Sequence, residues 1–353
     1  MSCYRTVRPA LFLLPPEIAH RTAVRTLACG MGPQSDFIDP ALTTEVAGLT
    51  LSNPVGLAAG FDKNAEAVNG AHEAGFGFVE IGTVTPRAQP GNPKPRLFRL
   101  VQDEAVINRL GFNNAGVEAA ASRLRVRRSG IVGGNIGKNK DSADAITDYV
   151  TAMRILYPVV NYITVNISSP NTPGLRALQA GNELQALVKA LHAVRRELGG
   201  SKPIFVKIAP DNDVPALQAI AQVAQAEGID GLIISNTTIR RDYIAGPHAH
   251  EQGGLSGRPL FAASTETLRY MYRLTEGKVP LIGVGGISNA ADAYEKIRAG
   301  ASAVQLYTAL VYQGFGLVEK INRGLVELLA RDGLSNVKQA IGVDAALRSK
   351  AAL

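Results

Sequence analysis

The chain has 353 residues, of which 46% are hydrophobic and 19% are charged, a balance that is typical of a folded globular protein and excludes a disordered one. Its net charge of +7 favours an anionic partner, but the Lys and Arg residues are scattered, which argues against nucleic acid. The two cysteines, Cys3 and Cys29, exclude a disulfide framework, favour a reducing compartment and leave the rest of the chain without thiol chemistry. No apolar run is long enough to span a membrane, and Pro15 and Pro16 end the run at Ala10–Leu14 too early for a secretory signal.

The first 30 residues stand apart from the rest of the chain. Pro9 is expected to begin one short helix and Glu17 a second. On a helical wheel Arg21 and Arg25 lie roughly opposite an apolar side that is formed by Ala19, His20, Ala23, Val24 and Leu27. A basic amphipathic helix pair of this kind can lie on an anionic membrane surface, and the alternative is a pair that simply packs on the main domain.

Beyond a small hairpin, predicted at Thr44–Val46 and Leu49–Leu51, short apolar runs alternate with helical stretches. The runs are rich in Val, Ile and Leu, which predicts parallel strands buried on both faces, at Val55–Ala58, Phe78–Ile81, Ile131–Asn135, Tyr162–Asn166, Ile204–Ile208, Gly231–Ser235, Leu281–Val284 and Ala303–Leu306. The predicted helices are Asn64–Ala74, Ala143–Tyr157 with Ser142 as N-cap and Pro158 as its end, Val214–Glu227, Ser264–Thr275, Ala290–Ala299 and Leu317–Ala330.

Eight strands that alternate with helices predict an α/β protein, a (β/α)8 barrel (TIM barrel) with a small N-terminal α-helical extension. The competing fold is an open doubly wound sheet. That fold would lead us to expect a G-x-G-x-x-G turn after the first strand, whereas the first run here leads into Ala58–Asn64 (AAGFDKN).

The active site of such a barrel lies at the carboxyl ends of its strands. Carboxylates are nearly absent there, and amides recur whose paired donors and acceptors suit a flat heterocycle: Asn135, Asn166, Asn171 and Asn236. Lys63 and Lys207 suit an anionic ligand. The glycine-rich turn at 283–286 and the turn at 307–308 follow the seventh and eighth strands, which is the usual phosphate position of these barrels.

The five histidines, at positions 20, 72, 192, 248 and 250, do not have the spacing of a metal site. His248 and His250 lie in a loop rich in Gly and Pro and are predicted to be surface residues. The sequence contains neither a G-x-S-x-G nor an H-E-x-x-H motif. It therefore predicts no metal.

Six strand-end motifs are long and specific: Asn53–Lys63 (NPVGLAAGFDK), Asn108–Asn113 (NRLGFN), Asn135–Lys140 (NIGKNK), Asn166–Thr172 (NISSPNT), Gly253–Gly257 (GGLSG) and Gly283–Ile287 (GVGGI). Together they resemble the dihydroorotate dehydrogenases, most closely the membrane-associated class 2. The resemblance covers nearly the whole chain. It implies oxidation of (S)-dihydroorotate to orotate in pyrimidine biosynthesis, with FMN as hydride acceptor and a quinone as final electron acceptor.

The resemblance also implies roles for single residues. Ser169 resembles the base that removes a proton from C5 while hydride leaves C6, with Thr172 and Phe112 as its catalytic neighbours. The implied substrate contacts are Lys63, Asn108, Arg109, Leu110, Gly111, Phe112, Asn166, Asn171, Asn236 and Thr237. The implied contacts of one FMN per chain are Ala59, Gly60, Lys63, Thr83, Asn135, Asn166, Lys207, Ser235, Gly257, Gly286, Tyr307 and Thr308. Lys207 would balance charge on the reduced flavin, and Ser235 stands where the family often has Thr.

For the N-terminal segment the resemblance implies a quinone tunnel. Residues 1–40 would form a helical membrane module and residues 41–353 the FMN-binding barrel, with His20, Arg99 and Tyr307 at the quinone site. A monomeric, peripheral membrane protein is expected. The N-terminus lacks a clear transit peptide, which favours the cytoplasmic face of a bacterial inner membrane over a mitochondrion.

Three alternatives remain open from the sequence. A soluble class 1 dehydrogenase would pass electrons to fumarate or to a second subunit that carries flavin and an iron–sulfur cluster, but it would use a Cys base. A flavin barrel that modifies tRNA relies on a Cys acid and would bind RNA in a salt-dependent manner. A peripheral membrane adaptor built on an inactive barrel would be colourless when purified.

Overall fold

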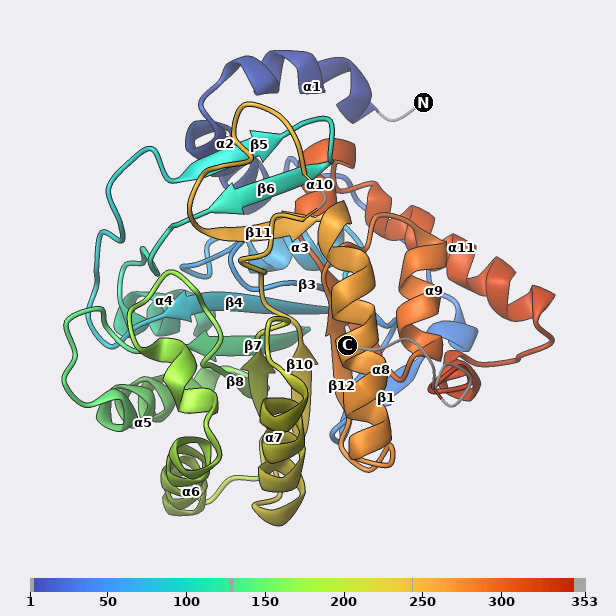
Figure 1. Cartoon of the computed structure of the whole chain (residues 1–353). Coiled ribbons are helices and arrows are strands. Elements are labelled where there is room, and N and C mark those ends of the chain that lie inside the picture. The colour runs from blue at the N-terminus through green and yellow to red at the C-terminus, as the bar shows by residue number, and fades with distance from the viewer. Residues whose placement is uncertain (1–2, 127–129, 243, 346–353) are drawn as a thin grey trace.

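The computed structural model describes residues 3–126, 130–242 and 244–345. Its centre is a closed barrel of eight parallel strands (Figure 1). In chain order they are β3 (Val55–Leu57), β4 (Phe78–Val84), β7 (Ile131–Ile136), β8 (Tyr162–Asn166), β9 (Ile204–Ile208), β10 (Gly231–Ile234), β12 (Leu281–Val284) and β13 (Ala303–Leu306). Every strand coincides with a predicted apolar run, and β13 pairs with β3 to close the ring, so the predicted barrel is confirmed.

Aromatic side chains that pack over glycines of neighbouring strands fill the interior of the barrel. A Cβ atom on Gly133 would lie 2.0 Å from Cζ of Tyr162 on the neighbouring strand, and a Cβ atom on Gly231 would lie 2.3 Å from Cε1 of Phe205. The Tyr162 and Phe205 rings pack edge to face with their centroids 5.3 Å apart. The interior is therefore a packed core below the strand ends, and space for a ligand remains only above it.

Helices surround the barrel: α3 (Val68–Glu73), α4 (Val117–Leu124), α5 (Ala145–Leu156), α6 (Gly181–Glu197), α7 (Val214–Ala226), α8 (Phe261–Leu274), α9 (Ala290–Arg298), α10 (Thr308–Gln313) and α11 (Leu317–Arg331). Short 3-10 turns are η1 (Pro40–Leu42), η2 (Tyr157–Val159), η3 (Leu175–Gln179), η4 (Arg258–Leu260) and η5 (Val337–Ala340). The sequence did not predict α4, α6 or α10, although α6 buries Leu184, Leu187, Val188, Leu191 and Val194 at helical spacing.

Two predicted helix starts were wrong for local reasons. Asp144, not Ser142, caps α5, because its carboxylate accepts the backbone N–H of Thr147. Helix α3 begins at Val68 rather than Asn64, because the Asp62 carboxylate accepts two backbone N–H groups within the preceding segment, at 2.7–2.8 Å, and holds it as a loop.

A second, antiparallel sheet covers the open end of the barrel, and the sequence analysis missed it. It consists of β5 (Leu97–Leu100), β6 (Ala105–Asn108) and β11 (Gly254–Gly257), in the order β11-β6-β5 (Figure 1). The predicted hairpin, β1 (Thr44–Val46) and β2 (Leu49–Leu51), is confirmed. Residues from two distant parts of the chain thus form one cover over the strand ends.

Helices α1 (Cys3–Leu13) and α2 (Pro16–Ala28) lie beside this cover (Figure 1). Pro9 was wrongly expected to begin a helix, since it lies inside α1. Its missing N–H removes one helical hydrogen bond, and the turns around it are tied to the barrel: the Tyr4 hydroxyl donates to the carbonyl of Val311 (2.6 Å) and Arg8 to that of Tyr312 (3.1 Å). Helix α2 carries proline at its first position, as helices tolerate.

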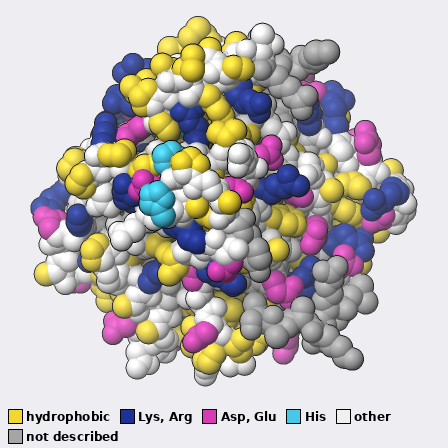
Figure 2. Space-filling view, turned by 45° about the horizontal axis from the view of Figure 1, so that its top comes forward, with side chains coloured by type: hydrophobic (Ala, Val, Ile, Leu, Met, Phe, Trp, Pro, Cys, Tyr) yellow, Lys and Arg dark blue, Asp and Glu magenta, His cyan; other side chains and the backbone are white. Residues whose placement is uncertain are grey.

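Helix α2 packs on the barrel through Val24 and Leu27, which are buried. The two helices and the turn that joins them nevertheless expose large apolar side chains at Val7, Leu13, Leu14 and Ile18, followed by Met31. Figure 2 shows hydrophobic side chains gathered at the top of the molecule, where α1 lies in Figure 1. Among the described residues, no helix is long and apolar enough to cross a membrane.

Candidate active site

A cavity of about 770 Å³ lies at the carboxyl ends of the barrel strands, within the size range of small-molecule sites. Its walls come from the barrel loops, from the covering sheet and from α1 and α2. Most of the predicted site residues line it: His20, Ala59, Gly60, Lys63, Thr83, Arg99, Asn108, Leu110, Gly111, Phe112, Asn166, Ser169, Asn171, Lys207, Ser235, Asn236, Thr237, Gly257, Gly286, Tyr307 and Thr308.

Three predicted residues are absent from this lining. Arg109 forms an ion pair with Glu251 (2.6 Å) and lies over the Phe98 ring, which draws its guanidinium into the covering sheet. Asn135 is fully buried below the cavity, and Thr172 is buried in the loop behind Ser169. The structure therefore places the Arg109 guanidinium as a support of the cover.

Four amides at the strand ends hold one another in place. Asn171 donates to Oδ1 of Asn108 (3.2 Å) and thereby joins the loop after β8 to the covering sheet. Asn236 donates to Oδ1 of Asn166 (3.3 Å) and to the Ser168 hydroxyl (3.0 Å). Because each amide is oriented by a neighbour while it lines the cavity, the cluster offers a preformed edge to a planar polar ligand.

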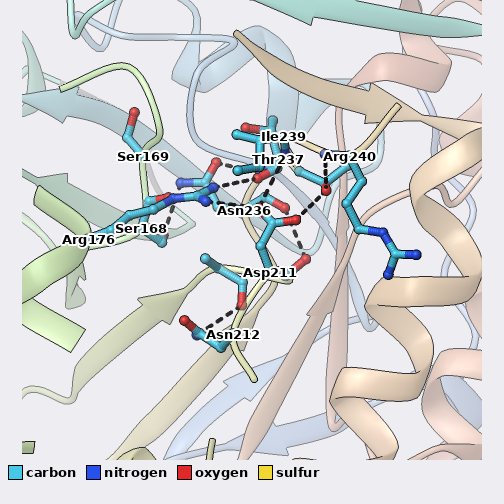
Figure 3. Close-up of polar contacts among 12 residues, drawn as sticks. Ser168, Ser169, Arg176, Asp211, Asn212, Asn236, Thr237, Ile239 and Arg240 are labelled. Atoms are coloured by element: carbon cyan, nitrogen blue, oxygen red, sulfur yellow. Dashed lines mark hydrogen bonds and ion pairs between the residues drawn. The ribbon is translucent and has the colours of Figure 1, made fainter. Parts of the chain in front are cut away.

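Arg176 of η3 braces the loop that carries Ser169 (Figure 3). Its Nε donates to the carbonyl of Ser168 (3.1 Å), and its guanidinium donates to the carbonyl of Thr237 in the loop after β10 (3.3 Å). Asp211, in the loop after β9, forms an ion pair with Arg176 at 2.9 Å and also accepts the backbone N–H of Ile239. A single guanidinium thus ties together three loops at the edge of the cavity.

Phe112 has a backbone φ of 54°, a left-handed conformation that is rare for a bulky residue. Its carbonyl accepts hydrogen bonds from the side chains of Asn114 (2.7 Å) and Gln89 (3.2 Å), which hold this conformation. A Cβ atom on Gly137 would lie 2.9 Å from the Phe112 ring, so glycine is required there. Backbone strain held by its surroundings is common at functional sites.

Two lysines give the cavity positive charge. Burial, aided by Arg96, lowers the pKa of Lys63 to about 7, and its ammonium donates to Oδ1 of Asn113 (2.6 Å). An anionic ligand would stabilise the charged form of Lys63. Burial also lowers the pKa of Lys207, and the Glu80 carboxylate acts against that shift.

The end of the cavity beside α1 and α2 is aromatic. The His20 ring lies 5.2 Å from that of Phe61, which in turn packs edge to face on Tyr307. Burial lowers the pKa of His20 to about 4 and raises that of Tyr307, so both groups are neutral at neutral pH, and the Tyr307 hydroxyl shares a hydrogen bond with Nδ1 of His20 (3.2 Å). Arg99 donates to carbonyls at the end of α1, Leu11 and Phe12, and its guanidinium covers the Phe12 ring.

The residues present fit a flavin phosphate and ring. A Cβ atom on Gly257, at the end of β11, would lie 2.4 Å from the carbonyl oxygen of Glu104, and one on Gly286 would lie 2.5 Å from Cβ of Phe261. Both positions therefore require glycine and leave bare backbone at the cavity wall. Deeper in the cavity, Oε1 of Gln305 is buried and has no hydrogen-bond partner among the described residues. An acceptor left open in this way suits an N–H group of a bound ring.

Sequence reasoning missed three residues that organise this site: Glu80, Arg176 and Gln305. A signal was present for Glu80, because a carboxylate inside an apolar strand run is buried and needs partners. Arg176 carried no comparable signal, since an arginine in a polar loop is an ordinary surface residue.

The fold and the cavity define a (β/α)8-barrel enzyme. Its site combines an amide-rich pocket with glycine backbone and lysine side chains that suit an anion. The family model for dihydroorotate dehydrogenase matches residues 41–329, and the chain belongs to that family. It is 54% identical over 348 residues to the dihydroorotate dehydrogenase (quinone) of Parvibaculum lavamentivorans, covering 98% of this chain and 99% of the relative. It is 54% identical over 338 residues to that of Agrobacterium fabrum, covering 94% and 93%.

Solved structures agree with this assignment. The chain resembles the crystal structure of the Eimeria tenella enzyme in complex with ferulenol, with a TM-score of 0.92 and 42% identity over 96% of this chain and 99% of that one. The ligand-free Eimeria tenella structure gives a TM-score of 0.90 at 43% identity, over 93% and 99%. The relatives named here as quinone enzymes match nearly from end to end, which argues against the soluble class 1, tRNA-modifying and adaptor alternatives.

Proposed function

We propose that this chain oxidises dihydroorotate to orotate in pyrimidine biosynthesis and passes the electrons to a quinone. The observation that carries the proposal is the continuity of the cavity, which joins the amide cluster around Ser169 to the wall formed by α1 and α2. Dihydroorotate needs the polar end of the cavity, and the quinone needs the apolar end. The quinone enzymes among its relatives support the same reaction.

FMN is the cofactor that we propose, and when bound it supplies the acceptor for the hydride from C6. Its phosphate would lie on the bare backbone at Gly257 and Gly286, near Thr308. Lys207 would lie near the ring and favour its reduced, negatively charged form. The remaining proposed contacts are Ala59, Gly60, Lys63, Thr83, Asn135, Asn166, Ser235 and Tyr307.

Ser169 is the proposed base that removes the proton from C5. It is 6% exposed and lines the cavity, and its oxygen accepts the backbone N–H of Asn171 at 3.3 Å. A serine hydroxyl is a weak base in water, so it requires a dry pocket and a proton made acidic by the adjacent ring carbonyl. Phe112 supplies part of the dry wall, and the buried hydroxyl of Thr172 is proposed to help carry the proton away.

The proposed substrate contacts are the amide cluster with Lys63, Leu110, Gly111 and Thr237, which all line the cavity. The substrate carboxylate would be held by the Lys63 ammonium. Arg109 would act through Glu251 by steadying the cover.

Residues 1–40 are proposed as a quinone and membrane module, and residues 41–353 as the catalytic barrel. The family model begins at residue 41, which agrees with this division. His20, Arg99 and Tyr307 would line the quinone path, and the exposed apolar side chains of α1 and α2 would enter the interface of a bacterial inner membrane from the cytoplasmic side. Because one chain supplies every proposed contact, we propose a monomer.

A visible spectrum of the purified protein tests both half-reactions. We expect a yellow protein with one FMN per chain that bleaches when dihydroorotate is added without oxygen and turns yellow again when a quinone analogue is added. A colourless protein that takes up no FMN would overturn the proposal. A yellow protein that bleaches but is not reoxidised by the quinone would overturn only the second half-reaction.

Replacing Arg176 with alanine is expected to raise the KM for dihydroorotate about tenfold or more, since hydrogen bonds from a charged donor contribute about 1.5–3 kcal/mol. Arg176→Lys keeps the positive charge but lacks the several N–H donors of the planar guanidinium, so its KM should lie between those of the wild type and Arg176→Ala. Steady-state kinetics with a saturating quinone measure the effect. Arg154→Ala, which breaks the exposed ion pair with Glu197, is the matched control and should leave KM unchanged. An equal KM in the Arg176 and Arg154 variants would contradict the bracing role.

A further inference from the structure

A buried carboxylate below the cavity has no role in the reaction as proposed above. Glu80 of β4 is 0% exposed, and its side chain points into the barrel interior among residues of β7, β8 and β13. No ion pair between described residues within 4.0 Å includes it. An ionised carboxylate so deeply buried must be stabilised by other means, because its desolvation is costly.

Four hydrogen-bond donors surround Glu80. Oε1 accepts from Nδ2 of Asn135 (2.8 Å). Oε2 accepts from Nε2 of Gln305 (2.9 Å), the hydroxyl of Thr164 (3.0 Å) and the hydroxyl of Tyr162 (3.2 Å). Burial raises the pKa of Tyr162, and the adjacent carboxylate raises it further, so this phenol remains a donor. Since an ionised carboxylate only accepts, this set of donors matches the charged form of Glu80.

The carboxylate fixes the direction of a chain of hydrogen bonds that rises to the cavity. Because Asn135 turns its NH₂ group down to Glu80, its Oδ1 points up and accepts from the Thr83 hydroxyl (2.6 Å). The Thr83 oxygen then accepts from Nδ2 of Asn166 (2.8 Å), whose Oδ1 accepts from Asn236. The carboxylate therefore determines which atoms of the amide cluster are left to donate and which to accept.

Gln305 and Lys207 also line the cavity and interact with the Glu80 carboxylate. Gln305 also turns its NH₂ group to Glu80, which leaves the buried Oε1 as an open acceptor in the cavity wall. Lys207 lines the cavity, is 5% exposed, and gains stabilisation of its charged form from Glu80. Lys207 is thus paired electrostatically with the carboxylate, without a direct hydrogen bond.

We infer that Glu80 is a positioning residue of the flavin floor, which orients the amides of Asn135 and Gln305 and balances the charge of Lys207, and thereby sets the reduction potential of the bound flavin. The inference rests on the proposed FMN site and goes beyond it. It assigns to the barrel interior a control over how strongly the reduced flavin is favoured, separate from the groups that touch the substrate.

The test is the reduction potential of FMN in Glu80→Gln compared with the wild type, measured by spectroelectrochemistry between about pH 6 and pH 9. In the variant, Lys207 loses its counter-charge and gives up its proton as the pH rises, so the reduced flavin loses its positive neighbour. The ratio of affinities for reduced and oxidised FMN should fall about tenfold at the alkaline end relative to the wild type. That change corresponds to a potential about 30 mV more negative for a two-electron couple.

Glu80→Asp keeps the charge and is the matched control, whose profile should run parallel to that of the wild type. Thr164→Val removes one donor to the carboxylate and should show a smaller change in the direction of Glu80→Gln, which provides a test if that variant does not fold. A difference from the wild type that does not vary with pH, in every variant that binds FMN, overturns the inference. A wild-type protein that binds no FMN would instead overturn the proposed function.

Discussion

Replacement of Ser169 by alanine is expected to slow the reduction of the bound flavin by dihydroorotate by about 10²- to 10⁴-fold, the usual contribution of a positioned general base. The variant should still bind FMN and orotate. Ser169 donates no side-chain hydrogen bond to a described residue, and its oxygen receives only the 3.3 Å contact from Asn171, so its loss leaves the amide cluster in place. Anaerobic stopped-flow bleaching of the flavin measures the rate directly and leaves the quinone step out.

The neighbouring serine is the matched control. Ser168 is fully buried and turns its hydroxyl to Asn166 and Asn236 instead of the cavity. Ser168→Ala should therefore weaken orotate binding while bleaching at saturating substrate stays close to that of the wild type. Near-normal bleaching in Ser169→Ala, or an equal loss in both variants, would show that Ser169 is not the base.

The barrel could be predicted from the sequence because its strands are buried on both faces. Such strands must be continuously apolar, and each is followed by a turn and a helix, so the eight runs were found with boundaries close to those observed. The local hairpin of β5 and β6 was simply missed, whereas the pairing of β6 with β11 escaped because the two strands lie about 150 residues apart in the observed register. No local pattern records a pairing of that kind.

Residues that line the cavity were easier to predict from the sequence than the residues that hold them in place. Residues that line the cavity lie in motifs at strand ends, and these motifs led to most of them. Their supports were harder to find. Arg109 lies within such a motif, yet its contacts with Glu251 and Phe98 turn it away from the cavity. Arg176 acts through the loops after β9 and β10, and Glu80 acts through side chains of β7, β8 and β13. Those partners are known only once the barrel has closed.

Deleting residues 1–40 is expected to abolish quinone reduction and membrane binding while anaerobic bleaching by dihydroorotate is retained. Helices α1 and α2 supply the apolar wall of the cavity, and His20 lies against Phe61 and Tyr307 there. The polar end of the cavity is built from barrel loops and the covering sheet, which lie outside the deleted segment. Reoxidation of the bleached flavin by a quinone analogue, and flotation with vesicles of anionic lipid, measure the two losses.

Deletion also uncovers barrel surface that Val24 and Leu27 bury, so a point variant in the full chain is needed beside it. His20→Ala removes a ring that packs on both Phe61 and Tyr307 and should slow reoxidation by the quinone, whereas Arg21→Ala alters the opposite side of α2 and should not. Because the pKa of His20 is about 4, its ring stays neutral, and the quinone step should show no titration of this group from about pH 6 upward. If the truncated protein reduces quinone with unchanged efficiency, the helices are not part of the quinone path. The continuity of the cavity would then reflect packing alone.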